Sequence, residues 1–434
     1  MTRRDFGRSP DNQMIRVEIK PELLSWARER AGFEPGVLAG RFPKLASWEQ
    51  GTAQPTLKQI EKFASATHTP IGFLFLQEPP VEHIPIPDFR TAGNKRIGRP
   101  SPDLLDMIYV CQQRQEWYRD FARGERISPL SFVGSANLNS GVESTAATMR
   151  HALGFDIEER RRIPTWTDAL RLFIGQADEA GIMVMCSGVV LNNNYRPLDP
   201  DEFRGFALSD SLAPLVFING ADIKAAQMFT LAHELAHIWL GQSAVSDAQA
   251  SLVPEHHVER WCNSVAAELL VPLGILKQEY DDGLSLRSEL DRLARRFKVS
   301  TLVILRRIHD AGGLTKEEFC REYEKELERL LAISKGSGGN FYLTQAARVS
   351  KRFARALVIS TLEGQTLHRD AFRMLGFAKF DTFQKLGRSL GVMRNALPAR
   401  RQRVHPGKAP SLWNGLLPGV LGLAYREECR KRRI

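Results

Sequence analysis

The sequence predicts an α+β chain that is mostly helical and divided into several domains. The chain has 434 residues, more than a single hydrophobic core usually organises. Apolar residues recur at helical spacing along most of its length. Short apolar runs bounded by glycines or turn residues predict three strands near the middle, at 181–190, 203–208 and 214–218. These strands are expected to form a small sheet directly before one strongly apolar helix.

The bulk composition narrows the class of protein. Hydrophobic residues make up 43% and charged residues 25% of the chain, as is typical of soluble globular proteins. No apolar run is long enough to span a bilayer, and the opening MTRRDFGRSP lacks the apolar core of a secretory signal. The five cysteines are odd in number and form no C-x-x-C pair, which favours a reducing compartment over cysteine-bound zinc. We therefore expect a cytoplasmic protein that has no membrane partner.

A helical domain is predicted for residues 17–78, after a disordered lead at 1–16. Prolines, glycines and helical spacing predict four short helices. They are expected to begin at Pro21, Pro35, Lys44 and Thr56. The runs WARERAG and SWEQGTAQPTLKQIEKFA resemble the Xre-type helix-turn-helix family, and this resemblance implies DNA binding.

This helix-turn-helix is predicted to be degenerate. The stretch LAGRFPKLASWEQG is shorter than the second helix, turn and recognition helix of the family, and Pro43 falls at the turn. Residues 17–80 contain seven Lys/Arg and seven Asp/Glu, so the domain has no net charge with which to neutralise phosphates. Most of the chain's net charge of +10 lies in the tail 393–434. We therefore favour a structural or partner-docking role for this domain over DNA binding. Any DNA contact, through this domain or the tail, is expected to be weak and independent of a recognition helix at 44–50.

Residues 79–135 are predicted to hold a linker and one helix. The run 79–100 is too rich in proline for regular structure, whereas Leu104–Arg123 has helical spacing. Residues 136–335 form the next predicted domain, which contains the small sheet and the apolar helix.

The stretch that carries chemistry is FTLAHELAHIWLGQ, residues 229–242. His233 and His237 are four residues apart in a helical run, so both imidazoles lie on one face and can bind one metal ion. Glu234 points about 100° away from His233, where it can accept a proton from water instead of binding the ion. Imidazole ligands and an open coordination position suit Zn²⁺. Thr230 and Gly241 are the expected ends of the helix.

A third ligand is expected from PEHHVERWCNSVAAELLVP, residues 254–272. On a helix Glu259 and Asn263 share a face, whereas Glu268 points almost opposite to Glu259. Glu259 is therefore the predicted third zinc ligand, with Glu268 as the alternative, and Asn263 is predicted to orient a ligand from behind. Two further histidines are expected to face solvent or substrate: His256 and His257.

These motifs, together with FRGFALSD and APLVFIN before them, resemble the ImmA/IrrE family of bacterial and phage zinc metallopeptidases. The resemblance spans roughly residues 180–310 and implies a gluzincin-like core. It implies zinc binding by His233, His237 and a downstream glutamate, with Glu234 as general base. It also implies a protein substrate, because these enzymes cleave or otherwise relieve transcriptional repressors. Cys262 and Val265 stand where alanine and phenylalanine are more usual, a departure at packing positions.

The C-terminal part carries no evident catalytic group. We interpret the helix-turn-helix-like spacing at 290–308 as part of the peptidase domain. Residues 336–392 predict a helical extension, which resembles that of long ImmA/IrrE proteins encoded beside PIN-like toxins and implies such a toxin as partner. Its expected core residues are Phe353, Leu357, Phe372, Leu375 and Phe383. Residues 393–434 are predicted to be a disordered basic tail, with a translated frameshift as the alternative, because the helical pattern stops at Gly391.

The prediction from sequence is a zinc-dependent endopeptidase that cleaves a repressor-like protein in a bacterial or phage regulatory circuit. The alternative is a non-catalytic antitoxin or transcriptional regulator that binds DNA or a toxin and keeps zinc for structure. Glu234 favours the enzyme, because a structural zinc site needs no base beside its ligands.

Overall fold

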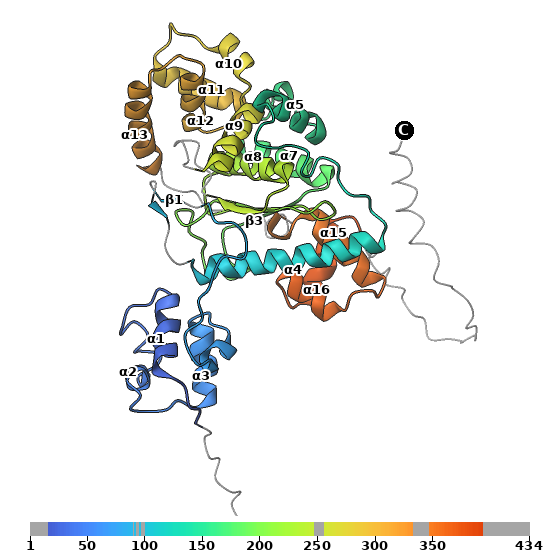
Figure 1. Cartoon of the computed structure of the whole chain (residues 1–434). Coiled ribbons are helices and arrows are strands. Elements are labelled where there is room, and N and C mark those ends of the chain that lie inside the picture. Colours follow the sequence, from blue (N-terminus) through green and yellow to red (C-terminus); the bar gives the residue numbers. More distant parts are fainter. Residues whose placement is uncertain are drawn as a thin grey trace, which may run out of the picture. The chain divides into compact units, whose positions relative to one another are not determined.

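The computed structural model describes residues 16–89, 91–92, 95–96, 100–246, 256–332 and 347–393 (Figure 1). It is mostly helical with one four-stranded mixed sheet, as an α+β chain should be. Most of the predicted lead and nearly all of the predicted basic tail lie outside the described residues. Within these ranges no helix is both long and apolar enough to cross a bilayer.

The N-terminal helices surround a core of their own. They are α1 (Pro21–Arg30), α2 (Leu45–Glu49), α3 (Leu57–Ala66) and the 3-10 helix η1 (Ile71–Phe75). Their shared core includes Leu24, Trp48 and Phe63. The helix predicted at 35–42 is wrong: these residues form turns, since Gly36 has a φ of 94°, outside the range of a right-handed helix. The short α2 agrees with the truncated stretch seen in the sequence.

The sheet consists of β3 (Met183–Ser187), β4 (Gly205–Leu208), β5 (Leu215–Asn219) and β6 (Ala244–Ser246). Its order is β3-β5-β4-β6, with β3 and β5 parallel and the other pairs antiparallel. Three strands were predicted. The fourth, β6, was missed because its three residues are too few to show an alternating pattern.

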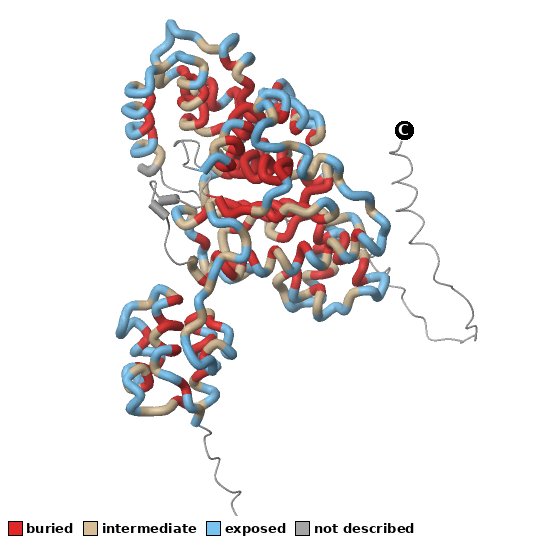
Figure 2. Tube along the Cα trace, viewed as in Figure 1, coloured by how far each residue is buried: buried red, intermediate tan, exposed pale blue. Residues whose placement is uncertain are grey.

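Helices cover both faces of the sheet (Figure 1). Side chains alternate along each strand, so Val184 and Val216 enter one core and Met185 and Phe217 enter the other. The first core is shared with α7 (Trp166–Ala180), α8 (Lys224–Leu240) and α9 (His257–Leu270). The second is shared with α4 (Pro102–Gly124) and α15 (Lys351–Leu362). Figure 2 shows the sheet and α8 as the most continuously buried part.

The remaining elements complete these layers. A two-stranded ribbon pairs Thr91–Ala92 (β1) with Lys95–Arg96 (β2). The other helices are α5 (Val142–Leu153), α6 (Ile157–Arg161), α10 (Leu273–Glu279), α11 (Leu286–Phe297), α12 (Thr301–Asp310), α13 (Lys316–Ala332), α16 (His368–Leu375) and α17 (Phe380–Ser389). Helices α11 and α12 contribute to the same core as α8, as the interpretation of 290–308 required. The predicted core residues of the extension all pack into the second core.

A buried carboxylate joins the C-terminal extension to α7. Asp178 Oδ1 accepts a hydrogen bond of 2.9 Å from the Ser350 hydroxyl, and Arg352 Nε donates to the Asp178 carbonyl oxygen over 2.8 Å. Burial raises the pKa of Asp178 to about 6. This contact fixes the start of α15 against the end of α7.

Candidate metal centre

The centre is built on α8, which packs against the sheet and is buried from Gln227 to Leu240. The helix begins at Lys224, not near Thr230, whose hydroxyl lies mid-helix and donates to the Ala226 carbonyl. Alanine and long apolar residues with high helix propensity favour this helix, so it forms without a side-chain cap at its start. Gly241 ends it as predicted, with a φ of 71°. Burial on all sides is what holds both imidazoles in one position.

His233, His237 and Glu259 converge. The two Nε2 atoms lie 3.1 Å apart. Glu259, from the first turn of α9, places Oε2 3.2 Å from His233 Nε2 and Oε1 3.1 Å from His237 Nε2. All three side chains are buried, and together they form a His/His/Glu cluster of metal-ligating type.

The donor set fits a zinc ion. Ligands about 2.05 Å from tetrahedral zinc lie about 3.3 Å from one another, close to the separations between these nitrogen and oxygen atoms. Two imidazoles and one carboxylate also leave a fourth position for water, as catalytic zinc sites do. Burial alone would lower the pKa of His233, yet the adjacent Glu259 carboxylate raises it. A divalent cation bound here would compete with protons for these ligand atoms.

Asn263 selects the tautomer of His233. Its Oδ1 lies 2.8 Å from His233 Nδ1. A carbonyl oxygen can only accept, so Nδ1 carries the proton and Nε2 keeps its lone pair toward the cluster. The position is one turn beyond Glu259 on α9, on the face predicted from the sequence.

Glu234 lies beside the cluster without entering it. Its Oε1 accepts a hydrogen bond of 2.6 Å from Ser246 in β6, and no donor among the described residues reaches its Oε2. Burial raises the pKa of Glu234. Gly205 in β4 makes room for it, since a Cβ there would lie 2.7 Å from Thr230 and 3.0 Å from Glu234 Oε1. The arrangement leaves one carboxylate oxygen free to exchange a proton.

Glu268, the alternative ligand, lies elsewhere. It forms a buried ion pair with Arg307 of α12, and its oxygens accept from the Leu273 amide. Near the opposite end of α9, it closes the junction between α9 and α12 and not the cluster. The 180° difference in helical direction from Glu259 accounts for this separation.

Phe89 is the site residue that sequence reasoning missed. Its ring stacks on His237 with centroids 6.4 Å apart and approaches His256 to 4.3 Å. His256 and His257 are both exposed at the start of α9, in line with their predicted exclusion from the ligand set. Phe89 lies in the proline-rich connector, where no pattern tied it to the site. Ser246 likewise carried no signal.

Comparison with known families bears on this region. Residues 177–309 match the Peptidase_M78 family model. That family is described as the IrrE N-terminal-like domain, and the match supports the relation to ImmA/IrrE metallopeptidases for this part of the chain, less than half of its length. Residues 349–389 match a domain of unknown function, DUF8813. No curated protein matches the chain.

The Peptidase_M78 region contains the three cluster residues, Glu234 and Asn263. A metallopeptidase domain implies a bound metal, typically zinc, and the His/His/Glu cluster is where such an ion fits. The matches to known families bear on neither the N-terminal helix-turn-helix nor a toxin partner, which stay predictions.

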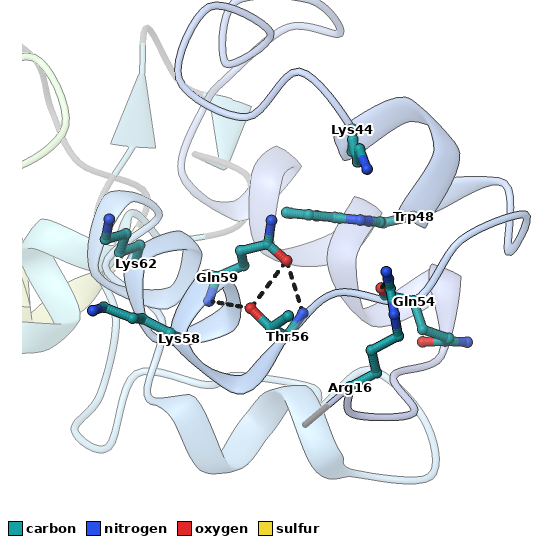
Figure 3. A pocket seen from close by; sticks show the side chains of 8 residues that line it. All are labelled: Arg16, Lys44, Trp48, Gln54, Thr56, Lys58, Gln59 and Lys62. Atoms are coloured by element: carbon teal, nitrogen blue, oxygen red, sulfur yellow. Dashed lines mark hydrogen bonds between the residues drawn. The ribbon is translucent and has the colours of Figure 1, made fainter. Parts of the chain in front are cut away.

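A second feature is a basic pocket of about 280 Å³ in the N-terminal domain (Figure 3). Four cations line it: Arg16, Lys44, Lys58 and Lys62. None of its described lining residues is acidic. The Thr56–Gln59 capping box occupies the start of α3 beside these cations. Although residues 17–80 are neutral as a whole, three of their seven Lys/Arg line this one pocket together with Arg16.

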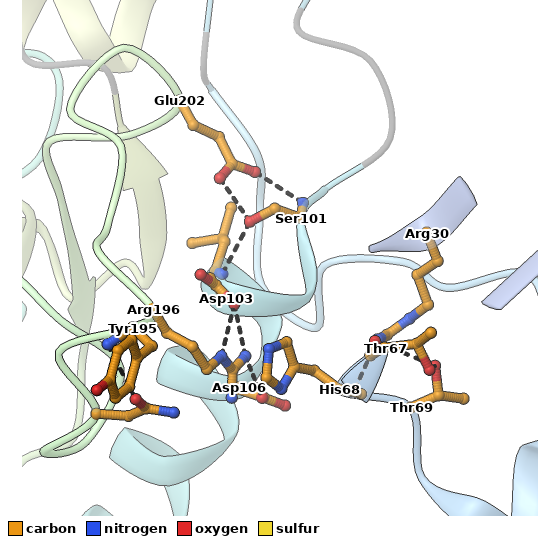
Figure 4. Close-up of polar contacts among 12 residues, drawn as sticks. Arg30, Thr67, His68, Thr69, Ser101, Asp103, Asp106, Tyr195, Arg196 and Glu202 are labelled. Carbon is orange, nitrogen blue, oxygen red and sulfur yellow. Dashed lines mark hydrogen bonds and ion pairs between the residues drawn. The ribbon is translucent and has the colours of Figure 1, made fainter. Parts of the chain in front are cut away.

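A third cluster of charged residues has a structural role. Arg196, in the loop after β3, pairs with both Asp103 and Asp106 of α4 at 2.6–2.7 Å (Figure 4). Ser101 at the start of α4 donates to Glu202 in the same loop. These pairs hold the loop between β3 and β4 against α4, and they satisfy one another.

Proposed function

We propose that the chain is a zinc-dependent endopeptidase of the HExxH, gluzincin-like type. The observation that carries this proposal is the division of labour on α8 and α9. Three side chains converge on one point, while the carboxylate next to them is kept out of the cluster with one oxygen free. A purely structural site would gain nothing from burying that extra carboxylate, whose desolvation is costly.

Each residue has a role that its surroundings support. His233, His237 and Glu259 would hold the ion, and Asn263 would keep His233 in the binding tautomer. Bound zinc would polarise the scissile carbonyl and acidify the attacking water. Glu234 would act as general base, accepting a proton from the attacking water and returning it to the leaving amine. The raised pKa of Glu234 suits a group that must both take and return a proton.

The substrate we propose is a protein, in the first instance a repressor-like regulator in a bacterial or phage circuit. This follows from the similarity to IrrE-type domains. A regulator of this kind also implies action in the cytoplasm.

The test is substrate trapping. Glu234→Gln is expected to keep zinc and fold but to leave the substrate uncleaved, so the substrate should accumulate and co-purify with this variant. His151→Ala, which changes an exposed histidine in the last turn of α5, is the control and should behave as the unmodified chain does. A cleaved product that forms equally with Glu234→Gln would refute the peptidase.

The second candidate is a regulator that acts by binding DNA or a toxin. The basic pocket favours contact with phosphate, since cations without acidic neighbours neutralise a polyanion. Exposed apolar side chains on the C-terminal extension favour a partner protein such as the PIN-like toxin: Leu362, Leu367 and Phe380. If Lys58→Ala with Lys62→Ala weakens binding to duplex DNA while Arg41→Ala outside the pocket does not, this candidate gains the DNA contact it requires.

A further inference from the structure

The edge of the sheet runs beside the proposed base. Strand β6 pairs with β4 on one side and is the last strand in the order of the sheet. Its Ser246 donates to Glu234, so the strand and the carboxylate are in direct contact. An edge strand offers N–H and C=O groups to any extended peptide that can reach it.

The chain's own connector occupies this edge. The Val245 amide donates to the Pro87 carbonyl over 2.9 Å, and the Phe89 amide donates to the Val245 carbonyl over the same distance. Asp88 thereby pairs with Val245 in parallel. Pro87, Asp88 and Phe89 form a short added strand, which we call the strap.

The strap also covers the imidazoles. Phe89 stacks on His237 at an interplanar angle of 18° and packs against His256. The side chains of His233, Glu234 and His237 are fully buried. A peptide could not approach this face of the cluster along β6 while Phe89 remains in place.

The hold of the strap on β6 is limited. Pro85 and Pro87 have no amide hydrogen, so the segment cannot extend the ladder as an ordinary strand would. The backbone pairing between this segment and β6 that the described residues show consists of two hydrogen bonds, and the Phe89 ring beside it is half-buried. Pro87 and Asp88 are exposed. The strap is therefore bound to β6 in the folded chain but can be displaced from it.

We propose that Pro87–Phe89 is a self-docked strap in the peptide-binding edge of the enzyme, and that an extended substrate with an aromatic or large apolar residue must displace it. The inference rests on the proposed peptidase function and adds its regulation. Because the strap is tethered nearby, it competes at a high effective concentration and lowers the apparent affinity for any free peptide.

The test measures peptide binding in the full chain that carries Glu234→Gln, so that nothing is cleaved. The probe is a fluorescent peptide that copies residues 83–89, HIPIPDF, followed by anisotropy. Adding Phe89→Ala should tighten binding at least tenfold, about 1.4 kcal/mol. Phe132→Ala is the matched control, since Phe132 is half-buried and stacks on Trp239 of the same helix with centroids 4.4 Å apart. It should leave the affinity for the peptide unchanged.

Unchanged peptide affinity in folded Phe89→Ala, or an equal gain in Phe132→Ala, overturns the strap. If Phe89→Ala does not fold, Phe89→Leu replaces it, because leucine keeps apolar packing without the ring. Phe89→Leu must then also bind the peptide more tightly than the chain with Phe89 intact. The proposed activity is judged separately with Glu234 intact. Tighter peptide binding by Phe89→Ala, with no cleavage of any protein when Glu234 is intact, would support the strap and refute the peptidase activity. Cleavage with intact Glu234, but no change in peptide affinity on Phe89→Ala, would support the peptidase activity and refute the strap.

Discussion

Two glutamates on α9 should respond to the same substitution in opposite ways. Glu259 faces the two imidazoles, at 3.1–3.2 Å from their Nε2 atoms. Glu268, nine residues later, faces Arg307. Both are buried, and the sequence alone left either as the third ligand. Replacing each by glutamine removes one negative charge and preserves the volume of the side chain.

The magnitudes follow from the surroundings. Loss of an outer partner of a ligand weakens metal binding about 10–100-fold, so loss of the ligand charge in Glu259→Gln should exceed about 100-fold. Glu268→Gln should leave zinc affinity within about threefold, since no cluster atom contacts it. It should instead destabilise the fold by at most about 3 kcal/mol, because the buried Arg307 guanidinium loses its shorter ion pair and keeps the one with Asp310, 3.4 Å away. The side chains of Glu268 and Arg307 are 8% and 6% exposed, so solvent screens this pair little.

Two assays separate these effects. Zinc affinity is measured by competition with a chromophoric chelator. The free energy of unfolding is measured by urea denaturation with the metal removed, so that ion binding does not add to stability. Zinc lost in Glu268→Gln and retained in Glu259→Gln would refute the assignment and transfer the ligand role to Glu268.

Three further predictions concern other parts of the chain. Asn263→Ala should weaken zinc binding about 10–100-fold without abolishing it, because His233 loses its tautomer partner; a change below threefold in chelator competition would contradict this. The pKa of Asp178 is about 6 in the folded chain, above its ordinary value of 3.8, so between pH 3.8 and 6 the folded chain keeps a proton on Asp178 that the unfolded chain loses. Stability relative to Asp178→Asn should therefore fall by up to about 3 kcal/mol as the pH rises from about 4 to 7, and denaturation showing a rise would reverse the sign. A chain shortened to residues 1–392 should bind DNA weakly at physiological salt and show little preference for its own promoter; nanomolar promoter binding that Lys44→Ala with Gln50→Ala abolishes would contradict this.

The sequence predicted the helix of the site well because local spacing determines it. His233 and His237 share a face whatever surrounds them, and Gly241 ends the helix by its own backbone freedom. The start of α8 was misplaced at Thr230, since burial sustains the helix without a capping side chain. Sequence spacing shows that Glu259 and Glu268 lie on opposite faces of α9. Which of these faces meets α8 depends on tertiary packing, so spacing alone could not choose between them.

Contacts between distant segments escaped prediction. Ser246 reaches Glu234 only because a three-residue strand pairs with β4, and Phe89 reaches His237 from a connector about 150 residues away in sequence. Gly205 appeared in a recognisable run, but its purpose is steric and is visible only with Glu234 packed against it. The gathering of Lys44, Lys58 and Lys62 around one pocket of the N-terminal domain likewise depends on its tertiary structure.

We expect His233 and His237 to hold one zinc ion and the adjacent Glu234 to stay outside its ligand set. Elemental analysis of the purified chain tests it most directly. About one zinc per chain is expected for the unmodified protein and for Glu234→Gln, and almost none for His233→Ala or His237→Ala. Undiminished zinc in both histidine variants, or its loss in Glu234→Gln, would show that these residues do not hold the ion in this way.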